Sequence, residues 1–387
     1  MSEPTRQLRV ANIRAESAHA SQTLTADLLV GNRKKEVWFR TDADPISDMA
    51  DPFIPVALIP AMRRNWSLTV DGRVSSDLLD GAQRIQKTMT GWYPEYHKVP
   101  IRVAEEAHGE GAPHRSVATF FSGGVDSFYT LQQHRDEISH LIFVHGFDIP
   151  LGHKRERQRA SDSICKLAQS LDLQLVEVET NLRQFGQPHV SWVKAYFGAA
   201  IAAVALLLAP RFNRIYLPAS VSAAQLEPMG SHPDLDPDWG NGAMQLIHDG
   251  LHASRFDKVR ALCDWIPVHT HLRVCYQRNA SDLNCGRCRK CLWTMMMLSA
   301  AGCMDRVKTF AVPLELNALQ LYPPVPKYER DRFEEALSLL EGRNANPELR
   351  SVLRAMLDAN GKIPLRGKLK RVFARGRTYL AHRMVRE

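Results

Sequence analysis

Residue types that bind phosphate are concentrated in one heptapeptide, Phe121-Ser122-Gly123-Gly124-Val125-Asp126-Ser127. Its two glycines lack a Cβ, so the chain can turn tightly and bring backbone N–H groups close to an anion. Ser122 and Ser127 add hydroxyl donors, and the carboxylate of Asp126 could hold Mg²⁺ beside the phosphates. The heptapeptide is neither a Walker A loop, which ends in Gly-Lys-Ser/Thr, nor a Gly-x-Gly-x-x-Gly dinucleotide turn. We interpret it as a phosphate loop of another kind; the alternative is an ordinary glycine turn.

The residues on either side predict the elements that would position this loop. Ser116 to Phe121 is rich in β-branched and aromatic residues, which favours a strand, and Ser127 to His134 is amphipathic, which favours a helix. A helix that begins at the loop directs the positive end of its dipole to the same point as the glycine amides.

The alternation of strand and helix continues to about residue 225. The predicted strands cover residues 116–121, 140–146, 173–179 and 214–219, and the predicted helices cover residues 126–136, 153–170 and 191–209. This order predicts a parallel sheet with right-handed crossovers, in which ligands bind beyond the carboxyl ends of the strands. The Ser122 loop, residues 145–148 and the pair Ala219-Ser220 all follow such ends, so Ser220 is also a candidate nucleotide-binding residue.

A second group with chemical potential is a set of four cysteines spaced C-x9-C-x2-C-x2-C: Cys275, Cys285, Cys288 and Cys291. Four thiolates that leave no open coordination position suit a structural Zn²⁺, and Gly286 permits the tight turn between them. A redox dithiol and an iron–sulfur cluster are the alternatives. The remaining cysteines lie in helical patterns and are predicted to be small buried residues: Cys165, Cys263 and Cys303.

The string Ser-Gly-Gly-x-Asp-Ser resembles the PP-loop of the N-type ATP pyrophosphatases. Enzymes of that superfamily cleave ATP between the α and β phosphates, transfer AMP to a substrate oxygen and release pyrophosphate. The loop and the spacing of the four cysteines together resemble those of the 7-cyano-7-deazaguanine synthase (QueC) family. The resemblance covers about residues 116–305. This resemblance implies ATP, Mg²⁺ and structural Zn²⁺ as cofactors. It also implies that the loop residues Ser122, Asp126 and Ser127 are catalytic and that Val144 and Gly146 lie where the family's second strand meets adenine.

The predicted substrate residues depart from that family. Its substrate segment is replaced here by a stretch rich in Gly, Pro, His and Asp. We therefore expect the acceptor to be a carboxylate, of which a 7-deazaguanine-type acid is one candidate. A long polar loop near a strand end is typical of a substrate loop. The candidate substrate residues are Ser231, His232, Asp234 and Asp236, to which Lys194 and Arg273 are added as charges that could neutralise substrate or phosphate. Trp239 favours an ordered loop, because its side chain is costly to expose.

The flanking regions predict two further parts. Residues 1–110 are expected to form a β-rich accessory domain with strands at 24–30, 36–40, 53–59, 66–70 and 99–103 and a helix at 78–89. Residues 111–310 would form the PP-loop domain (adenine nucleotide alpha hydrolase-like), an α/β parallel-sheet core with a four-cysteine zinc knuckle. Residues 311–387 would form a helical extension, with helices at 329–341 and 347–360.

Composition limits the partners. The chain is 44% hydrophobic and 24% charged, as in ordinary globular proteins, and residues 362–387 contain nine basic and one acidic side chain, which accounts for the whole net charge of +8. This tail could bind a protein or an acidic surface, with RNA as a further alternative. The first residues contain no apolar run and the apolar segment 195–209 is shorter than the ~20 residues of a membrane span, so we expect a cytoplasmic location and no transmembrane segment.

The leading functional hypothesis is an ATP-dependent ligase or synthase that adenylates a carboxylate, which ammonia or an amine then attacks. Because the first cysteine is Cys165, we expect no N-terminal cysteine glutaminase, and we expect the nitrogen to come from free ammonia, the product of a partner or an amine. The alternatives are a PP-loop enzyme that activates an RNA base and a non-catalytic nucleotide-binding assembly protein.

Overall fold

The computed structural model describes residues 6–18, 21–109, 116–275, 282–322 and 327–358. The chain divides into two compact units, Met1–His252 and Ala253–Glu387. The predicted basic tail, residues 362–387, lies outside the described residues. No helix among the described segments combines the length and the apolar character needed to cross a bilayer.

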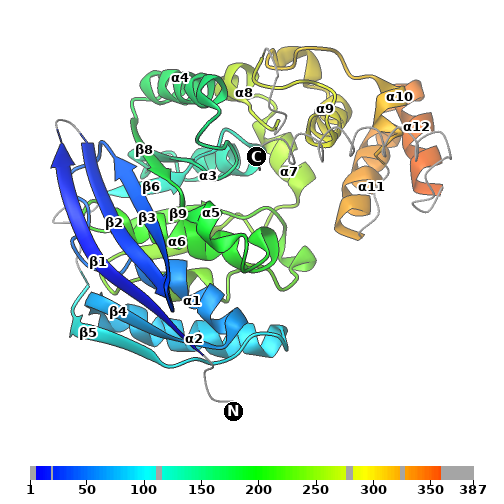
Figure 1. Cartoon of the computed structure of the whole chain (residues 1–387). Helices are drawn as coiled ribbons and strands as arrows, with labels where there is room; N and C mark the ends of the chain where they lie inside the picture. Colours follow the sequence, from blue (N-terminus) through cyan, green and yellow to red (C-terminus); the bar gives the residue numbers. More distant parts are fainter. Residues whose placement is uncertain (1–5, 19–20, 110–115, 276–281, 323–326, 359–387) are drawn as a thin grey trace. The chain divides into compact units, whose positions relative to one another are not determined.

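The first unit is built on one ten-stranded, mostly parallel sheet with the order β10-β9-β6-β7-β8-β3-β2-β1-β4-β5 (Figure 1). Its strands are β1 Arg6–Ala18, β2 Ser21–Val30, β3 Arg33–Thr41, β4 Trp66–Ser75, β5 Ile101–Ala107, β6 Val117–Phe120, β7 His140–His145, β8 Gln174–Thr180, β9 Arg214–Pro218 and β10 Gln245–Asp249. Its helical elements are α1 Phe53–Arg64, α2 Ser76–Trp92, α3 Val125–Gln133, α4 Lys154–Ser170, α5 Leu182–Gly186, the π-helical turn η1 Trp192–Tyr196, α6 Phe197–Leu207, and the 3₁₀ turns η2 Ala223–Gln225 and η3 Asp236–Trp239.

The parallel half of the sheet confirms the predicted alternation of strands and helices. β6, β7, β8 and β9 match the four predicted strands, and α3, α4 and α6 match the three predicted helices. β7 pairs with β6 and β8, and β9 pairs with β6 on the other side, all in parallel. The carboxyl ends of these strands therefore lie along one edge of the sheet.

β3 joins the N-terminal strands to this parallel half. It pairs antiparallel with β8 through three residue pairs, from Phe39 with Thr180 to Thr41 with Val178. The side chain of Asn181 extends the pairing, because its Oδ1 accepts from the Trp38 N–H at 3.0 Å and its Nδ2 donates to the Glu36 carbonyl at 2.9 Å. The N-terminal strands, which the sequence had assigned to an accessory domain, thus share a sheet with the parallel strands.

The predicted strand at 53–59 is wrong: these residues begin helix α1. All of Phe53–Met62 is buried, and an apolar run buried on every side shows no helical periodicity to separate it from a strand. Pro60 lies inside α1 and cannot donate to the Val56 carbonyl four residues earlier. The hydroxyl of the fully buried Tyr196 donates to that carbonyl instead, at 2.8 Å, and so links α1 to the start of α6.

The second unit is helical. It contains α7 Arg255–Leu262, α8 Ile266–His271, α9 Arg289–Ala301, the 3₁₀ turn η4 Met304–Arg306, α10 Leu316–Leu319, α11 Lys327–Gly342 and α12 Pro347–Asp358. α11 and α12 confirm the two helices predicted for the C-terminal region. Cys263 and Cys303 were predicted to be separate buried residues, but they form a disulfide that joins the end of α7 to the segment after α9.

Candidate functional site

The predicted phosphate loop connects β6 to α3 at the carboxyl edge of the sheet (Figure 1). Gly123 has φ +78°, which favours glycine, and Gly124 is the N-cap of α3 in an extended conformation. The Ser122 hydroxyl accepts from the Gly124 N–H at 3.4 Å, and the Ser127 hydroxyl donates to the Gly124 carbonyl at 3.0 Å. These two hydrogen bonds fix the turn from both sides.

The start of α3 suits an anion. The first hydrogen bond of the helix runs from the Phe128 N–H to the Gly124 carbonyl at 3.0 Å. The preceding N–H groups, including that of Val125, therefore have no acceptor within the helix and lie at its positive end. Asp126 is half-buried in the first turn, and Ser127 is buried.

The predicted residues of the neighbouring strands occupy the same edge. Val144 is half-buried near the end of β7, and Ser220 is exposed just after β9. Gly146, with φ +96°, follows β7 and donates its N–H to the Ile149 carbonyl at 3.0 Å. A Cβ at this glycine would lie 2.1 Å from the carbonyl oxygen of Thr180, so no other residue fits there without backbone movement. The structure thus places these residues beside the Ser122 loop on adjacent strands.

The predicted site segment at 145–148 contains a side chain that is already engaged. His145 is buried, and its Nδ1 accepts from Arg157 Nε at 3.1 Å while its Nε2 faces Glu177 at 2.9 Å. Because Arg157 can only donate, His145 carries its proton on Nε2 and donates it to Glu177. Burial alone would raise the pKa of Glu177, but the hydrogen bonds from His145 and Ser161 outweigh it and lower that pKa. This network fixes α4 to the sheet.

Residues that the sequence did not single out fix helix α3 against β10. Asp249, the last residue of β10, accepts from the Thr130 hydroxyl at 2.6 Å and faces His134 Nε2 at 2.9 Å. The Tyr129 hydroxyl lies 2.7 Å from Nε2 of His252. β10 was missed within the polar loop at 227–250, because Gln-Leu-Ile-His-Asp contains only one adjacent apolar pair, Leu246-Ile247, and no alternation of apolar and polar residues.

The candidate substrate loop is packed into the first unit. Trp239 and Asp236 are buried, as is His232, whose ring lies 4.7 Å from that of Trp92. The Asp236 carboxylate accepts from Ser231 at 2.8 Å and faces Nδ1 of His248 at 2.6 Å.

Only part of this loop can therefore meet a ligand directly. Burial raises the pKa of Asp236, against the hydrogen bond from His248, and burial lowers the pKa of His232. Asp234 is exposed. Of the candidate charges, Lys194 is exposed in η1, the turn that leads into α6, whereas Arg273 is half-buried in the second unit.

The four predicted cysteine ligands converge in the second unit. Their sulfur atoms all lie within 4.8 Å of one another, and the Cys275–Cys288 and Cys285–Cys291 sulfur pairs are 3.9 and 3.8 Å apart. A tetrahedral metal with ~2.3 Å bonds to sulfur needs sulfur atoms about 3.8 Å apart. The cluster could therefore hold a metal such as zinc.

The local chain explains how the cluster forms. Gly286 has φ +69°, which allows the N–H groups of Arg287 and Cys288 to donate to the sulfur of Cys285 at 3.4 and 3.3 Å. Cys288 is the N-cap of α9. Hydrogen bonds from the other three thiols, first that of Cys275, lower the pKa of Cys285.

Asn284 supports the cluster and was also missed by sequence. It is fully buried, and its Oδ1 accepts from the Val274 and Cys275 N–H groups at 2.7 and 3.0 Å. Its Nδ2 donates to the Leu272 carbonyl at 2.7 Å and to the Thr309 hydroxyl at 3.0 Å. The side chain thereby fixes the segment 272–275 beside the turn and the start of α9, which carry the other three ligands.

No protein-family model, no curated protein and no solved structure matches this chain.

Proposed function

We propose that this chain is a QueC-like, ATP-dependent synthase or ligase that activates a carboxylate with release of pyrophosphate, after which ammonia or an amine attacks the activated carbon. The observation that carries the proposal is the Ser122–Ser127 loop. A glycine at φ +78° and an extended glycine N-cap deliver the chain from a buried strand directly into the positive end of α3.

The residues fit the two groups that the resemblance implies. Backbone N–H groups at the start of α3 and the hydroxyl of Ser122 would hold phosphate oxygens, and Asp126 would hold Mg²⁺. Val144, Gly146 and Ser220 would contact the rest of the nucleotide, because they end the strands on either side of β6. When bound, ATP would supply the adenylyl group, which passes to a carboxylate oxygen as the bond between the α-phosphorus and pyrophosphate breaks, and Mg²⁺ would offset the charge on the departing pyrophosphate.

The protein's own contribution is fixed geometry. The Asp249 contacts with Thr130 and His134 hold α3 to β10, so the donors of the loop need no reorganisation when charge develops. Lys194 is an exposed cation at the end of the sheet where α6 begins, and we assign it to the carboxylate substrate. Asp234 and Ser231 would contribute polar contacts from the neighbouring loop.

We also propose that the four-cysteine cluster binds structural Zn²⁺. The two sulfur–sulfur distances near 3.8 Å support tetrahedral coordination, and four sulfur ligands leave no position for a substrate. The cluster would stabilise the second unit and take no part in the reaction.

Exchange of radiolabelled pyrophosphate into ATP tests the activation step. With a panel of carboxylic acids that includes 7-carboxy-7-deazaguanine, the native chain should show exchange without RNA, and Asp126→Ala should lose it while its circular dichroism spectrum is unchanged. Asp136→Ala is the matched control, because this aspartate follows α3 and lies outside the loop. Exchange that requires RNA would indicate activation of an RNA base. Nucleotide binding without exchange for any acid would refute an activating enzyme.

A further inference from the structure

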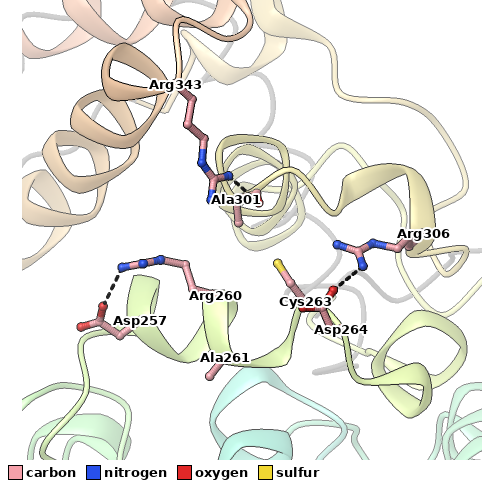
Figure 2. Close-up of a pocket in the computed structure, with 8 residues that line it drawn as sticks. All are labelled: Asp257, Arg260, Ala261, Cys263, Asp264, Ala301, Arg306 and Arg343. Atoms are coloured by element: carbon pink, nitrogen blue, oxygen red, sulfur yellow. Dashed lines mark hydrogen bonds and ion pairs between the residues drawn. The ribbon is translucent and has the colours of Figure 1, made fainter.

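The second unit contains a pocket of about 570 Å³ whose lining is dominated by charge (Figure 2). It is bounded by α7, the end of α9 and η4. Three arginines from three different elements line it: Arg260 of α7, Arg306 of η4 and Arg343, which follows α11. Figure 2 shows Arg343 entering from above toward Ala301, Arg306 from the right toward Asp264, and Arg260 extending from α7 to the left toward Asp257, with Cys263 between them. We call this the arginine pocket.

The contacts within the pocket use only part of its hydrogen-bonding capacity. Each guanidinium has five N–H donors. Arg343 donates to the Ala301 carbonyl at 2.9 Å, and Arg306 donates to Asp264 at 2.5 Å. Arg260 lies 3.6 Å from Asp257, an ion pair longer than a hydrogen bond. Three arginines against two aspartates leave a positive charge in the pocket, with donors left for an oxyanion.

An adjoining pocket has a different lining. It has a volume of about 470 Å³ and shares Asp257, Arg260 and Arg343 with the arginine pocket, but its wall also contains Phe256, Leu339 and Glu335. Burial raises the pKa of Glu335, and its carboxyl group accepts a hydrogen bond from Ser254 at 2.8 Å. The two pockets together thus offer shared guanidinium donors beside an apolar surface. This combination suits a small molecule that has both an anionic and an apolar part.

The disulfide holds the two arginine-bearing segments together. Arg260 lies three residues before Cys263, and Arg306 lies three residues after Cys303. The sulfur–sulfur bond therefore holds the backbones of the two segments that carry these arginines close together, although the segments are far apart in sequence. A fixed spacing is what recognition of a compact oxyanion by planar guanidinium groups requires.

We propose that the arginine pocket binds an organic phosphate, with the phosphate among Arg260, Arg306 and Arg343 and the organic part against Phe256 and Leu339. A phosphate fits better than a carboxylate, because three oxygens that carry nearly two negative charges match three separate guanidiniums. The proposal is independent of the nucleotide site, since all of these residues belong to the second unit.

Isothermal titration of the full-length chain with phenyl phosphate, inorganic phosphate and phenol tests the proposal. Phenyl phosphate should bind most tightly, inorganic phosphate more weakly, and phenol should not bind detectably. Arg260→Gln and Arg306→Gln should each weaken phenyl phosphate binding about tenfold or more, because each removes a charge-assisted hydrogen bond. Both side chains are partly exposed, so both variants should fold.

Arg354→Gln is the matched control. This arginine belongs to the same unit, pairs with Glu341 at 2.6 Å and lies outside both pockets. It should bind phenyl phosphate like the native chain, whereas Leu339→Ala should weaken phenyl phosphate binding and leave inorganic phosphate unchanged. Equal affinity in the native chain, Arg260→Gln and Arg306→Gln would overturn the proposal, because binding would then occur elsewhere, as at the Ser122 loop. An equal loss in Arg354→Gln would also overturn it, since it would indicate only a general charge effect.

Discussion

Replacement of Asn284 by alanine should disrupt the four-cysteine cluster without changing any of the four cysteines. The side chain is fully buried and makes four hydrogen bonds, two as acceptor from the Val274 and Cys275 amides and two as donor to Leu272 and Thr309. Alanine removes all four and leaves the partner groups in a site closed to solvent. The backbone that presents Cys275 then loses both hydrogen bonds that Asn284 accepts from it.

The magnitude follows from the contacts. A hydrogen bond contributes about 1 kcal/mol net, and a buried group left without a partner costs about 1–3 kcal/mol. Removal of four hydrogen bonds should therefore lower the free energy of unfolding by roughly 4 kcal/mol. Water that enters the vacated space would reduce this loss to about 3 kcal/mol. Because the change acts on the support of a ligand, zinc affinity should fall about 10–100-fold.

Zinc release to a chromogenic chelator gives a reading confined to the cluster, and urea unfolding gives the stability change. Asn317→Ala is the control, since Asn317 is exposed in α10 of the same unit and should change neither quantity appreciably. If Asn284→Ala releases zinc at native rates and unfolds at the native urea concentration, Asn284 does not position the ligands and the reasoning fails.

Three further predictions concern the rest of the chain. Gly146→Ala should lower Tm, reduce the free energy of unfolding by about 1–3 kcal/mol and abolish pyrophosphate exchange, because the new Cβ would meet the Thr180 carbonyl. Gly31→Ala is the control, since Gly31 has φ +56° and no atom within 4 Å of a Cβ, so this variant should show only the effect of backbone strain. Burial lowers the pKa of His140 in the folded chain, so as pH falls below about 6.5 the unfolded chain binds a proton before the folded chain does, and the folded state loses stability. The urea concentration at the unfolding midpoint should therefore decrease between neutral pH and about pH 5, and it should decrease less steeply in His140→Gln. Cys288→Ser should reduce zinc content, measured by mass spectrometry, together with solubility, and a soluble zinc-free variant of native Tm would contradict a structural metal.

The candidate site could be predicted from sequence where a local string carries the chemistry. The four cysteines lie at a fixed spacing, and the structure brings their sulfur atoms together. The Ser122–Ser127 loop lies in one short segment between β6 and α3, and its role as a phosphate loop stays a prediction. Asn284 could not be found this way, because its role depends on partners from two other segments, residues 272–275 and the one that contains Thr309. The Cys263–Cys303 disulfide was missed for the same reason, since the two cysteines are 40 residues apart.

The alternation of strands and helices in the parallel half was predictable because each strand and helix has its own pattern and their order implies the topology. α1 was mistaken for a strand because burial on every side removes the amphipathic signal. β10 was missed because it is short and follows many Gly, Pro and Asp residues. The pairing of β3 with β8 depends on contacts between residues about 140 positions apart, which no local pattern encodes.

That pairing has a consequence for any attempt to shorten the protein. Without Arg6–Thr41, β8 would become an edge strand whose backbone N–H and C=O groups on the β3 side have no partner. Such an exposed edge is a template for pairing with the same strand of another molecule. A fragment that keeps only the parallel strands should therefore polymerise through β8, which makes the N-terminal strands an intrinsic safeguard against fibre formation.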